Sequence, residues 1–353
     1  MFVAWRDLRF ARGRFALMGA VIVLITLLVG LLSGLTAGLA RDNTSALTGL
    51  PADHLAFARP AAGQAVSFTG STVAPEQWRE LAQRPGVRSA EPLGIRTLNA
   101  EAGGRTAAVS AFGVRPGSGL APDTTAAGTA VLSRTAAREL GVRTGGTLAL
   151  GARTLTVAAV SGDASYSHTP VVWTALADWQ RLTRSGGATV VALSTGSGAD
   201  LAAADRAAGT DTTTVDGALG AIGSYRAENG SLQLMRGFLF VISALVVGAF
   251  FTVWTIQRSG DIAVLKALGS STGHLLRDAL GQAAVMLVGG TALGTGLAAL
   301  VGAFVPDGVP FLMEPLTTVG PAAVMTVLGA LGAALSIRRI TAVDPLTALG
   351  SVR

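Results

Sequence analysis

Histidine, tyrosine and cysteine, three residue types often used for nucleophilic, acid–base or metal chemistry, are scarce in this sequence. The 353 residues include three histidines, two tyrosines and no cysteine. The lack of cysteine excludes thiolate nucleophiles, thiolate metal sites and disulfides. No arrangement of serine, histidine and aspartate is typical of a catalytic triad, and no GxxxxGKS/T phosphate-binding loop is present. The sequence therefore predicts a chain that is not an enzyme and holds no cofactor or metal ion of its own.

One group of side chains is spaced so as to act together. Tyr225, Glu228 and Met235 are separated by three and seven residues, which on a continuous helix places them on one face. Arg226 and Arg236 lie beside them and supply positive charge. Each residue also has an ordinary structural explanation. A tyrosine near a membrane boundary is a common anchor, a methionine in an apolar helix usually packs, and a glutamate near the start of a helix stabilises it.

Tyr166 and His168 form a second candidate pair, because only one residue separates them. Both side chains can ligate a metal or form hydrogen bonds. His168 precedes a Thr-Pro dipeptide, and a histidine that makes hydrogen bonds inside a folded domain fits the same pattern. Both interpretations are open from the sequence.

Four apolar runs are long enough to span a membrane, for which a helix needs roughly 20 residues. Half of the chain is hydrophobic, which is too apolar for a water-soluble protein of this length. The sequence therefore predicts an α-helical membrane protein. The four expected transmembrane helices are residues 15–39, 232–256, 274–305 and 316–337.

Charge orients these helices, because basic residues gather in cytoplasmic loops. Basic residues flank the runs at the N-terminus, between the second and third runs and after the fourth. The link between the third and fourth runs carries Asp307 and Glu314 instead. The chain is thus expected in the cell (plasma) membrane with both termini cytoplasmic. The remaining segments are a cytoplasmic amphipathic helix at 1–14, an extracytoplasmic domain at 40–231, a cytoplasmic coupling loop at 257–273, an outer loop at 306–315 and a cytoplasmic tail at 338–353.

The long segment 40–231 has the pattern of a mixed α/β domain inserted between the first two helices. Ser133 and Gly141 are placed to begin and end a helix over 133–140. Gly151 and Ala152 are placed to turn a hairpin. Further helices are expected at 75–83 and 176–182, and strands at 64–68, 87–99, 105–114, 147–150, 153–160, 171–174 and 189–194.

The loop after the second run has the most specific pattern. Ile262, Leu265 and Leu268 fall on one face of a short helix, which Gly269 can end in the left-handed conformation. A short helix with an apolar face at the mouth of a membrane bundle is suited to bind a soluble partner. A solvated connector would not need that face.

This loop, from Gln257 to Ser271, resembles the signature loop of FtsX-like permeases, a type that includes the MacB-type ATP-binding-cassette (ABC) exporters. The tail from Arg338 to Leu349 resembles the same family's C-terminal motif, and the layout of one helix, outer domain and three helices also matches. The resemblance implies a homodimer or heterodimer of permeases bound to two copies of a separate ATPase subunit, which carries ATP and Mg²⁺. Because two-fold pairing of identical chains is the commonest symmetric arrangement, a homodimer is expected. The resemblance also implies mechanotransmission through the membrane. The residues implied in contact with the ATPase are Arg258, Asp261, Ile262, Val264, Leu265 and Lys266.

Within that family the chain is most similar to haem-exporting permeases of Gram-positive bacteria. The similarity lies in three stretches, at residues 42–54, 165–173 and 225–231. Haem as a transported substrate needs an apolar slot, an axial ligand and cations for its propionates. The resemblance therefore makes haem the expected substrate. The candidate contacts are Tyr225, Glu228, Met235, Arg226, Arg236, Tyr166 and His168.

Other functions fit the same layout. An FtsX-like mechanotransmitter would regulate an outer cell-wall hydrolase, and a related exporter would move peptides, lipoproteins or antibiotics. The basic residues form no stripe typical of nucleic-acid binding, so the expected surroundings are membrane lipid and protein partners. Glycines spaced by four, Gly30, Gly34 and Gly38, permit close helix packing. That packing is equally compatible with contacts inside one chain and across a dimer.

Overall fold

The computed structural model describes residues 12–257, 264, 271–306 and 308–338. The chain divides into two compact units. One, the helical unit, comprises Met1–Gly38 and Ser231–Arg353, and the other, the α/β unit, comprises Leu39–Gly230. Each unit is described by itself.

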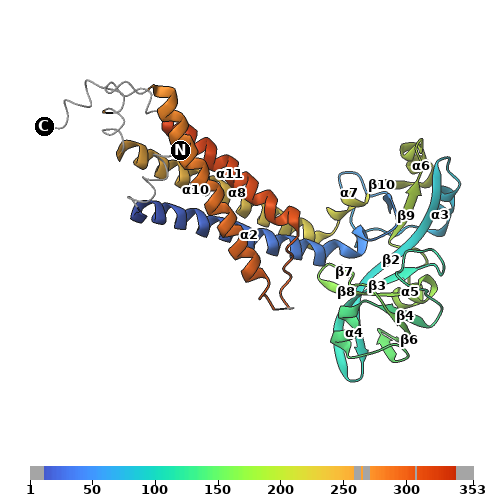
Figure 1. The fold of residues 1–353 in the computed structure, drawn as a ribbon. Helices are drawn as coiled ribbons and strands as arrows, with labels where there is room; N and C mark the ends of the chain where they lie inside the picture. The colour runs from blue at the N-terminus through green and yellow to red at the C-terminus, as the bar shows by residue number, and fades with distance from the viewer. Residues whose placement is uncertain (1–11, 258–263, 265–270, 307, 339–353) are drawn as a thin grey trace. The chain divides into compact units, whose positions relative to one another are not determined.

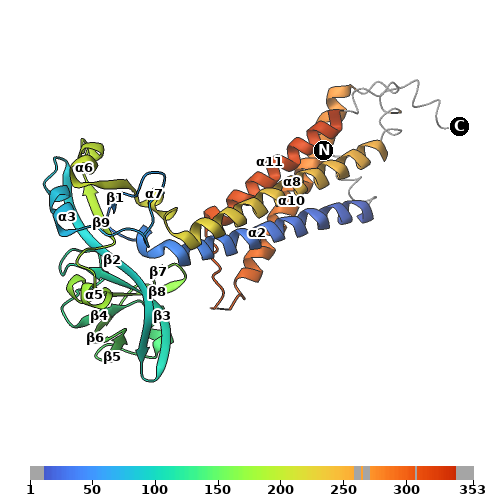
Figure 2. The same cartoon turned by 180° about the vertical axis from the view of Figure 1, so that it is seen from behind.

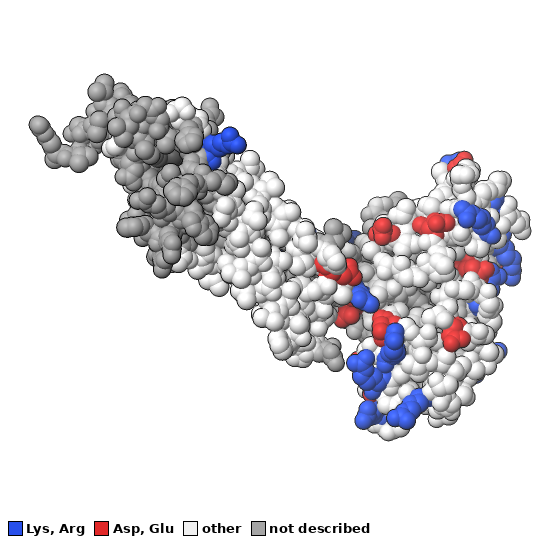
Figure 3. Space-filling model, viewed as in Figure 1, with Lys and Arg blue, Asp and Glu red and all other residues white. Residues whose placement is uncertain are grey.

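Four helices are long and apolar enough to cross a membrane, as the sequence predicts. They are α2 (Arg12–Thr48), α8 (Gly223–Gln257), α10 (Thr272–Gly302) and α11 (Pro315–Arg338). In the helical unit they lie side by side (Figures 1 and 2), and on the face that Figure 3 shows their described surface carries few charged side chains. Helix α2 continues nine residues beyond the apolar run that ends at residue 39, and α8 begins nine residues before the run that starts at 232. Polar residues extend a helix without adding to an apolar run.

The spaced glycines of α2 face other parts of the same chain. A Cβ atom on Gly34 would lie 2.5 Å from the Phe311 ring, and one on Gly38 would overlap the backbone carbonyl of Pro310. The Leu312 amide donates to the Gly34 carbonyl at 3.0 Å. The described contacts therefore assign these glycines to packing within the chain. Gly30, Gly290 and Gly294 make similarly close contacts with Ala298, Ile22 and Thr26, respectively.

The α/β unit is built on a ten-stranded sheet in the order β10-β1-β9-β2-β3-β8-β4-β6-β5, with β7 paired to β8. Strand β5 also pairs with β2, so six of the strands form a closed circuit. The strands are β1 (His54–Ala58), β2 (Val87–Ala102), β3 (Arg105–Val114), β4 (Thr129–Leu132), β5 (Thr147–Leu150), β6 (Arg153–Val160), β7 (Ser165–Tyr166), β8 (Thr169–Ala175), β9 (Val190–Thr195) and β10 (Thr210–Thr214).

Two apolar cores lie against this sheet. The first holds side chains from α3 (Pro75–Ala82), α4 (Arg134–Leu140), α5 (Leu176–Thr183) and α6 (Leu201–Ala208). The second holds the end of α2, α7 (Val215–Leu219) and several aromatic rings. Because these cores bury side chains from both faces of the strands, the strand sequences are nearly continuous apolar runs rather than clean alternations.

Most short elements follow local signals in the sequence. The Ser133 hydroxyl accepts the Ala136 amide at the start of α4, and Gly141 ends it with a φ of 64°. The predicted strand at 64–68 is wrong, because those residues have no strand partner even though Phe68 is buried. Strands β1, β4, β7 and β10 and helices α6 and α7 were not predicted from the sequence. These elements are short, and the polar β10 is held by its pairing with β1.

Candidate functional site

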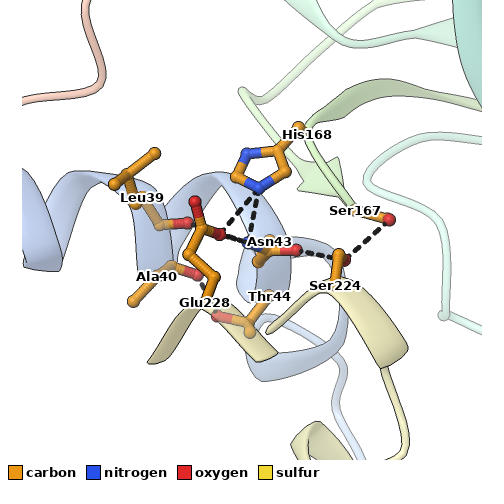
Figure 4. A network of polar contacts seen from close by, with 8 residues as sticks. All are labelled: Leu39, Ala40, Asn43, Thr44, Ser167, His168, Ser224 and Glu228. Carbon is orange, nitrogen blue, oxygen red and sulfur yellow. Dashed lines mark hydrogen bonds and ion pairs between the residues drawn. The ribbon is translucent and has the colours of Figure 1, made fainter. Parts of the chain in front are cut away.

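A cluster of polar side chains lies where three segments of the α/β unit meet (Figure 4). Asn43 comes from the end of α2, Ser167 and His168 from the β7–β8 turn, and Ser224 and Glu228 from the start of α8. In sequence, Asn43 is 125 residues from His168 and 185 from Glu228. We refer to these five residues as the Asn43 cluster.

Asn43 is the hub of this cluster. Its Nδ2 lies 2.7 Å from Glu228 Oε2 and 2.7 Å from His168 Nε2. Its Oδ1 accepts the Ser224 hydroxyl at 2.8 Å, and Ser224 Oγ lies 2.9 Å from Ser167 Oγ. The Asn43 side chain is completely buried, whereas those of His168 and Glu228 keep 35% and 32% of their exposure. The buried Asn43 amide therefore positions two partly exposed groups, the His168 imidazole and the Glu228 carboxylate.

The β7–β8 turn presents His168 in an uncommon conformation. Ser167 and His168 have φ angles of 49° and 61°, a region that residues other than glycine seldom adopt. Two positive φ angles match the type I′ hairpin turn, in which asparagine and glycine are preferred. The Ser167 amide donates to the Asn43 carbonyl at 3.0 Å, and the His168 amide donates to the Asp42 carbonyl. These bonds to α2 offset backbone strain of about 1–3 kcal/mol per residue.

The protonation of His168 changes the cluster. A neutral ring with its proton on Nδ1 lets Nε2 accept from Asn43, while Glu228 accepts the second amide hydrogen. A proton on Nε2 allows donation to Glu228, 2.9 Å away, but sets that N–H against the Asn43 amide. One protonation state thus cannot satisfy all three contacts.

The cluster unites only two of the predicted substrate contacts, His168 and Glu228. Tyr166, two residues before His168, is 6% exposed and packs edge-on against Phe68 and Phe112. Burial raises the pKa of the Tyr166 phenol, so its phenolate form is disfavoured. Tyr166 is therefore part of the core and does not share a site with His168.

The other predicted contacts have varied surroundings. Tyr225 is half-buried and packs on the second core, and Arg226 is exposed. Met235 and Arg236 belong to the helical unit. Met235 is 51% exposed there, and Arg236 donates a hydrogen bond to Gln233. Both remain sequence-based predictions.

Asn43, Ser167 and Ser224 were given no role by the sequence analysis. Asn43 could have been noticed because its amide side chain directly follows an apolar run in the same helix. A buried amide in such a place needs hydrogen-bond partners. In the described part of the chain, no three histidine, aspartate or glutamate side chains are grouped so as to hold a metal ion. Of the predicted ATPase contacts, Val264 is helical and half-exposed. Arg258, Asp261, Ile262, Leu265 and Lys266 lie outside the described residues.

Two sequence families match the chain. The MacB-like periplasmic core domain matches residues 15–210, more than half of the chain, and the FtsX-like permease C-terminal family matches residues 234–345. Two solved structures also align with it. The first is the periplasmic region of MacB from Actinobacillus actinomycetemcomitans, with a TM-score of 0.37 and 10% identity over 48% of this chain and 92% of that one. The second is the extracellular domain of the transporter YknZ from Gram-positive bacteria, with a TM-score of 0.36 and 13% identity over 46% of this chain and 98% of that one.

Curated relatives fall into two groups. A Staphylococcus haemolyticus permease named for hemin transport, HrtB, is 38% identical over 131 residues, which is 37% of each chain. The chain thus matches about a third of the length of that relative. An uncharacterised ABC transporter permease of Mycobacterium tuberculosis is 26% identical over 300 residues, 82% of each chain. The chain therefore belongs to the FtsX- and MacB-type ABC-transporter permeases, with a MacB-like extracytoplasmic α/β domain between the first and second of four candidate transmembrane helices.

Proposed function

We propose that this permease, together with a separate ABC ATPase, exports an amphipathic compound, and that haem is its substrate. The observation that carries the proposal is the 38% identity to a permease named for hemin transport, taken with the pairing of His168 and Glu228. The three stretches that resemble haem exporters, far apart in sequence, supply four of the five members of the Asn43 cluster, and Ser224 directly precedes the third stretch. This convergence supports a shared role for them.

The chemistry of the Asn43 cluster suits an iron porphyrin. Haem iron accepts an imidazole nitrogen as an axial ligand, and a carboxylate is a less usual one. His168 Nε2 and Glu228 Oε2 are partly exposed and 2.9 Å apart, so either can turn toward a ligand with a small movement. Arg226 is exposed two residues before Glu228 and supplies a cation for a propionate. Tyr225, Met235 and Arg236 stay in the proposal as residues to be tested one at a time.

The partners proposed follow from the family. ABC permeases act with an ATPase subunit, and a two-fold symmetric pair of permeases on two ATPases is the simplest closed arrangement. In this arrangement both termini and residues 257–273 face the cytoplasm. The ATPase contacts are then Arg258, Asp261, Ile262, Val264, Leu265 and Lys266. ATP and Mg²⁺ are bound by the ATPase, and haem passes as substrate rather than as a cofactor.

A haemin titration tests the substrate directly. The purified full chain in detergent is expected to give a saturable shift of the Soret band. Because each ligand to iron is worth more than one ordinary hydrogen bond, His168→Ala and Glu228→Ala should each weaken haemin binding about tenfold or more. His54→Ala is the matched control, since His54 lies on β1, with its Nδ1 3.3 Å from the Thr195 hydroxyl, and is not a member of the Asn43 cluster. A spectrum identical to haemin in empty micelles would overturn the haem assignment.

A further inference from the structure

A second site lies at a gap in the sheet of the α/β unit. On the side away from β3, strand β2 pairs with β9 as far as Leu93 and with β5 from Ala100 onward. Between these two partners, residues 94–99 have no strand partner at this edge. An uncovered stretch of strand edge presents backbone donors and acceptors to any chain that can lie beside it.

The backbone groups at this edge are only partly satisfied. The Ile95 amide donates to the Thr189 hydroxyl at 2.7 Å, and that hydroxyl donates to the Ile95 carbonyl at 3.2 Å. Backbone groups alternate between the two sides of a strand, so Thr97 directs its amide and carbonyl to the same edge as Ile95. Among the described residues none forms a backbone hydrogen bond to Thr97 there.

A cavity of about 420 Å³ opens at this gap. That volume is within the usual range for small-ligand sites, roughly 300–1,000 Å³. Helix α5 and the segment that joins it to β9 form one wall, and the segment before α3 forms another (Figure 2 shows α5 beside β2). The lining combines aromatic rings with many hydroxyl groups; it includes Phe68, Ser71, Thr97, Tyr166, Thr183 and Thr189.

Two further wall residues indicate the chemistry of the ligand. Arg96 is exposed, and no acidic side chain in the described part of the chain pairs with it. Trp179 is 4% exposed, seated against the paired glycines Gly94 and Gly113, and its Nε1 has no hydrogen-bond acceptor among the described residues. A ligand with hydrogen-bond acceptors and negative charge therefore suits this cavity better than a hydrocarbon.

We propose that this cavity binds a short extended peptide that lies along β2. The peptide backbone pairs with the amide and carbonyl of Thr97, as in other cases where a strand is added to a sheet edge. A carboxylate of the peptide, at its C-terminus or on an acidic side chain, pairs with Arg96. Recognition of the backbone makes binding tolerant of peptide sequence, while Arg96 selects for negative charge. The site does not depend on the haem proposal, because none of its residues belongs to the Asn43 cluster.

The test uses the full chain in detergent and a defined probe. The probe is a fluorescein-labelled pool of tetrapeptides, random at three positions and ending in aspartate with a free carboxylate. Fluorescence anisotropy measures binding, and amide hydrogen exchange locates it. Bound pool should slow exchange in the segment 94–99 at least about fivefold and leave the already paired segment 105–110 unchanged.

Variants separate the two parts of the proposed recognition. Arg96→Ala, or a pool ending in asparagine amide, should weaken binding about tenfold, the usual value of one charge-assisted hydrogen bond. Thr97→Pro removes the edge amide, together with the hydrogen bond between the Thr97 and Ser110 hydroxyls, and should abolish binding. Arg206→Ala, an exposed arginine on α6, is the control of equal charge and should bind as the native chain does. If Thr97→Pro does not fold, the Arg96→Ala variant and the hydrogen-exchange pattern of the native chain still test the peptide site. Absence of binding at millimolar peptide, or binding without protection of 94–99, would overturn the proposal.

Discussion

Replacement of Asn43 by alanine is expected to lower the stability of the α/β unit by about 3 kcal/mol. The variant removes a fully buried amide that contacts Glu228, His168 and Ser224. These partners are partly exposed or exposed, so the loss is the net value of the three hydrogen bonds, about 0.5–1.5 kcal/mol each and about 1.5–3 kcal/mol for one to a charged group such as Glu228. For a unit of this size the loss corresponds to a fall in melting temperature of roughly 6–12 °C. Thermal unfolding of the purified chain measures it.

Two further variants make this result specific. Thr44→Ala is the control, because the buried Thr44 hydroxyl donates to the Ala40 carbonyl of its own helix and has no other hydrogen-bond partner among the described residues. It should cost less than about 1 kcal/mol. Asn43→Asp keeps the shape but sets a second carboxylate against Glu228, which raises the pKa of the new acid. That variant should be unstable at pH 8 and recover as the pH falls and the acid is protonated. Equal melting of Asn43→Ala and Thr44→Ala would contradict the assigned role of Asn43.

Replacement of Gly38 by alanine is expected to disrupt the helical unit. The added Cβ would overlap the Pro310 carbonyl and crowd the Phe311 amide, both of them backbone groups that cannot rotate away. Forcing extra volume into a packed contact typically costs about 1–3 kcal/mol of stability. Because the neighbours of Gly38 are backbone atoms, we expect a cost of about 3 kcal/mol or more for Gly38→Ala. The variant should give a lower melting temperature and a lower yield of folded protein in detergent.

Gly296→Ala is the matched control for Gly38→Ala. Gly296 lies in α10, and a Cβ there would meet nothing within 4 Å. Alanine favours a helix over glycine by up to about 1 kcal/mol, so this variant should be neutral or slightly stabilising. If Gly38→Ala instead left melting unchanged and only separated dimers into monomers, the glycines would pack between chains and the assignment within the chain would be wrong.

Apolar run length was sufficient to predict four helices able to cross a membrane, because a helix in lipid needs roughly 20 apolar residues to span the hydrocarbon layer. Local capping signals such as Ser133 and Gly141 were equally informative. The Asn43 cluster was not predictable in this way. Residue spacing along one helix grouped Glu228 with Met235, whereas the contacts of Glu228 in the α/β unit are with Asn43 and His168, which are brought to it by tertiary folding.

The neighbours Tyr166 and His168 illustrate the same limit. Their closeness in sequence suggested a shared site, but Tyr166 is the last residue of β7 and His168 lies in the turn that follows. The strand directs Tyr166 into the aromatic core, and the left-handed turn presents His168 to the Asn43 cluster. Without knowledge of that turn, the spacing of Tyr166 and His168 in the sequence does not show that one lies in the core and the other in the Asn43 cluster.

The most direct test of the proposed function is ATP-driven haemin export by the complete transporter. The chain and the ABC ATPase co-expressed with it would be reconstituted in liposomes, and haemin leaving the membrane would be trapped by apomyoglobin. We predict haemin transfer that requires ATP and falls about tenfold or more in Glu228→Ala, while His54→Ala transports normally. ATP hydrolysis without any haemin transfer would contradict the account and leave the chain an ABC permease for another substrate.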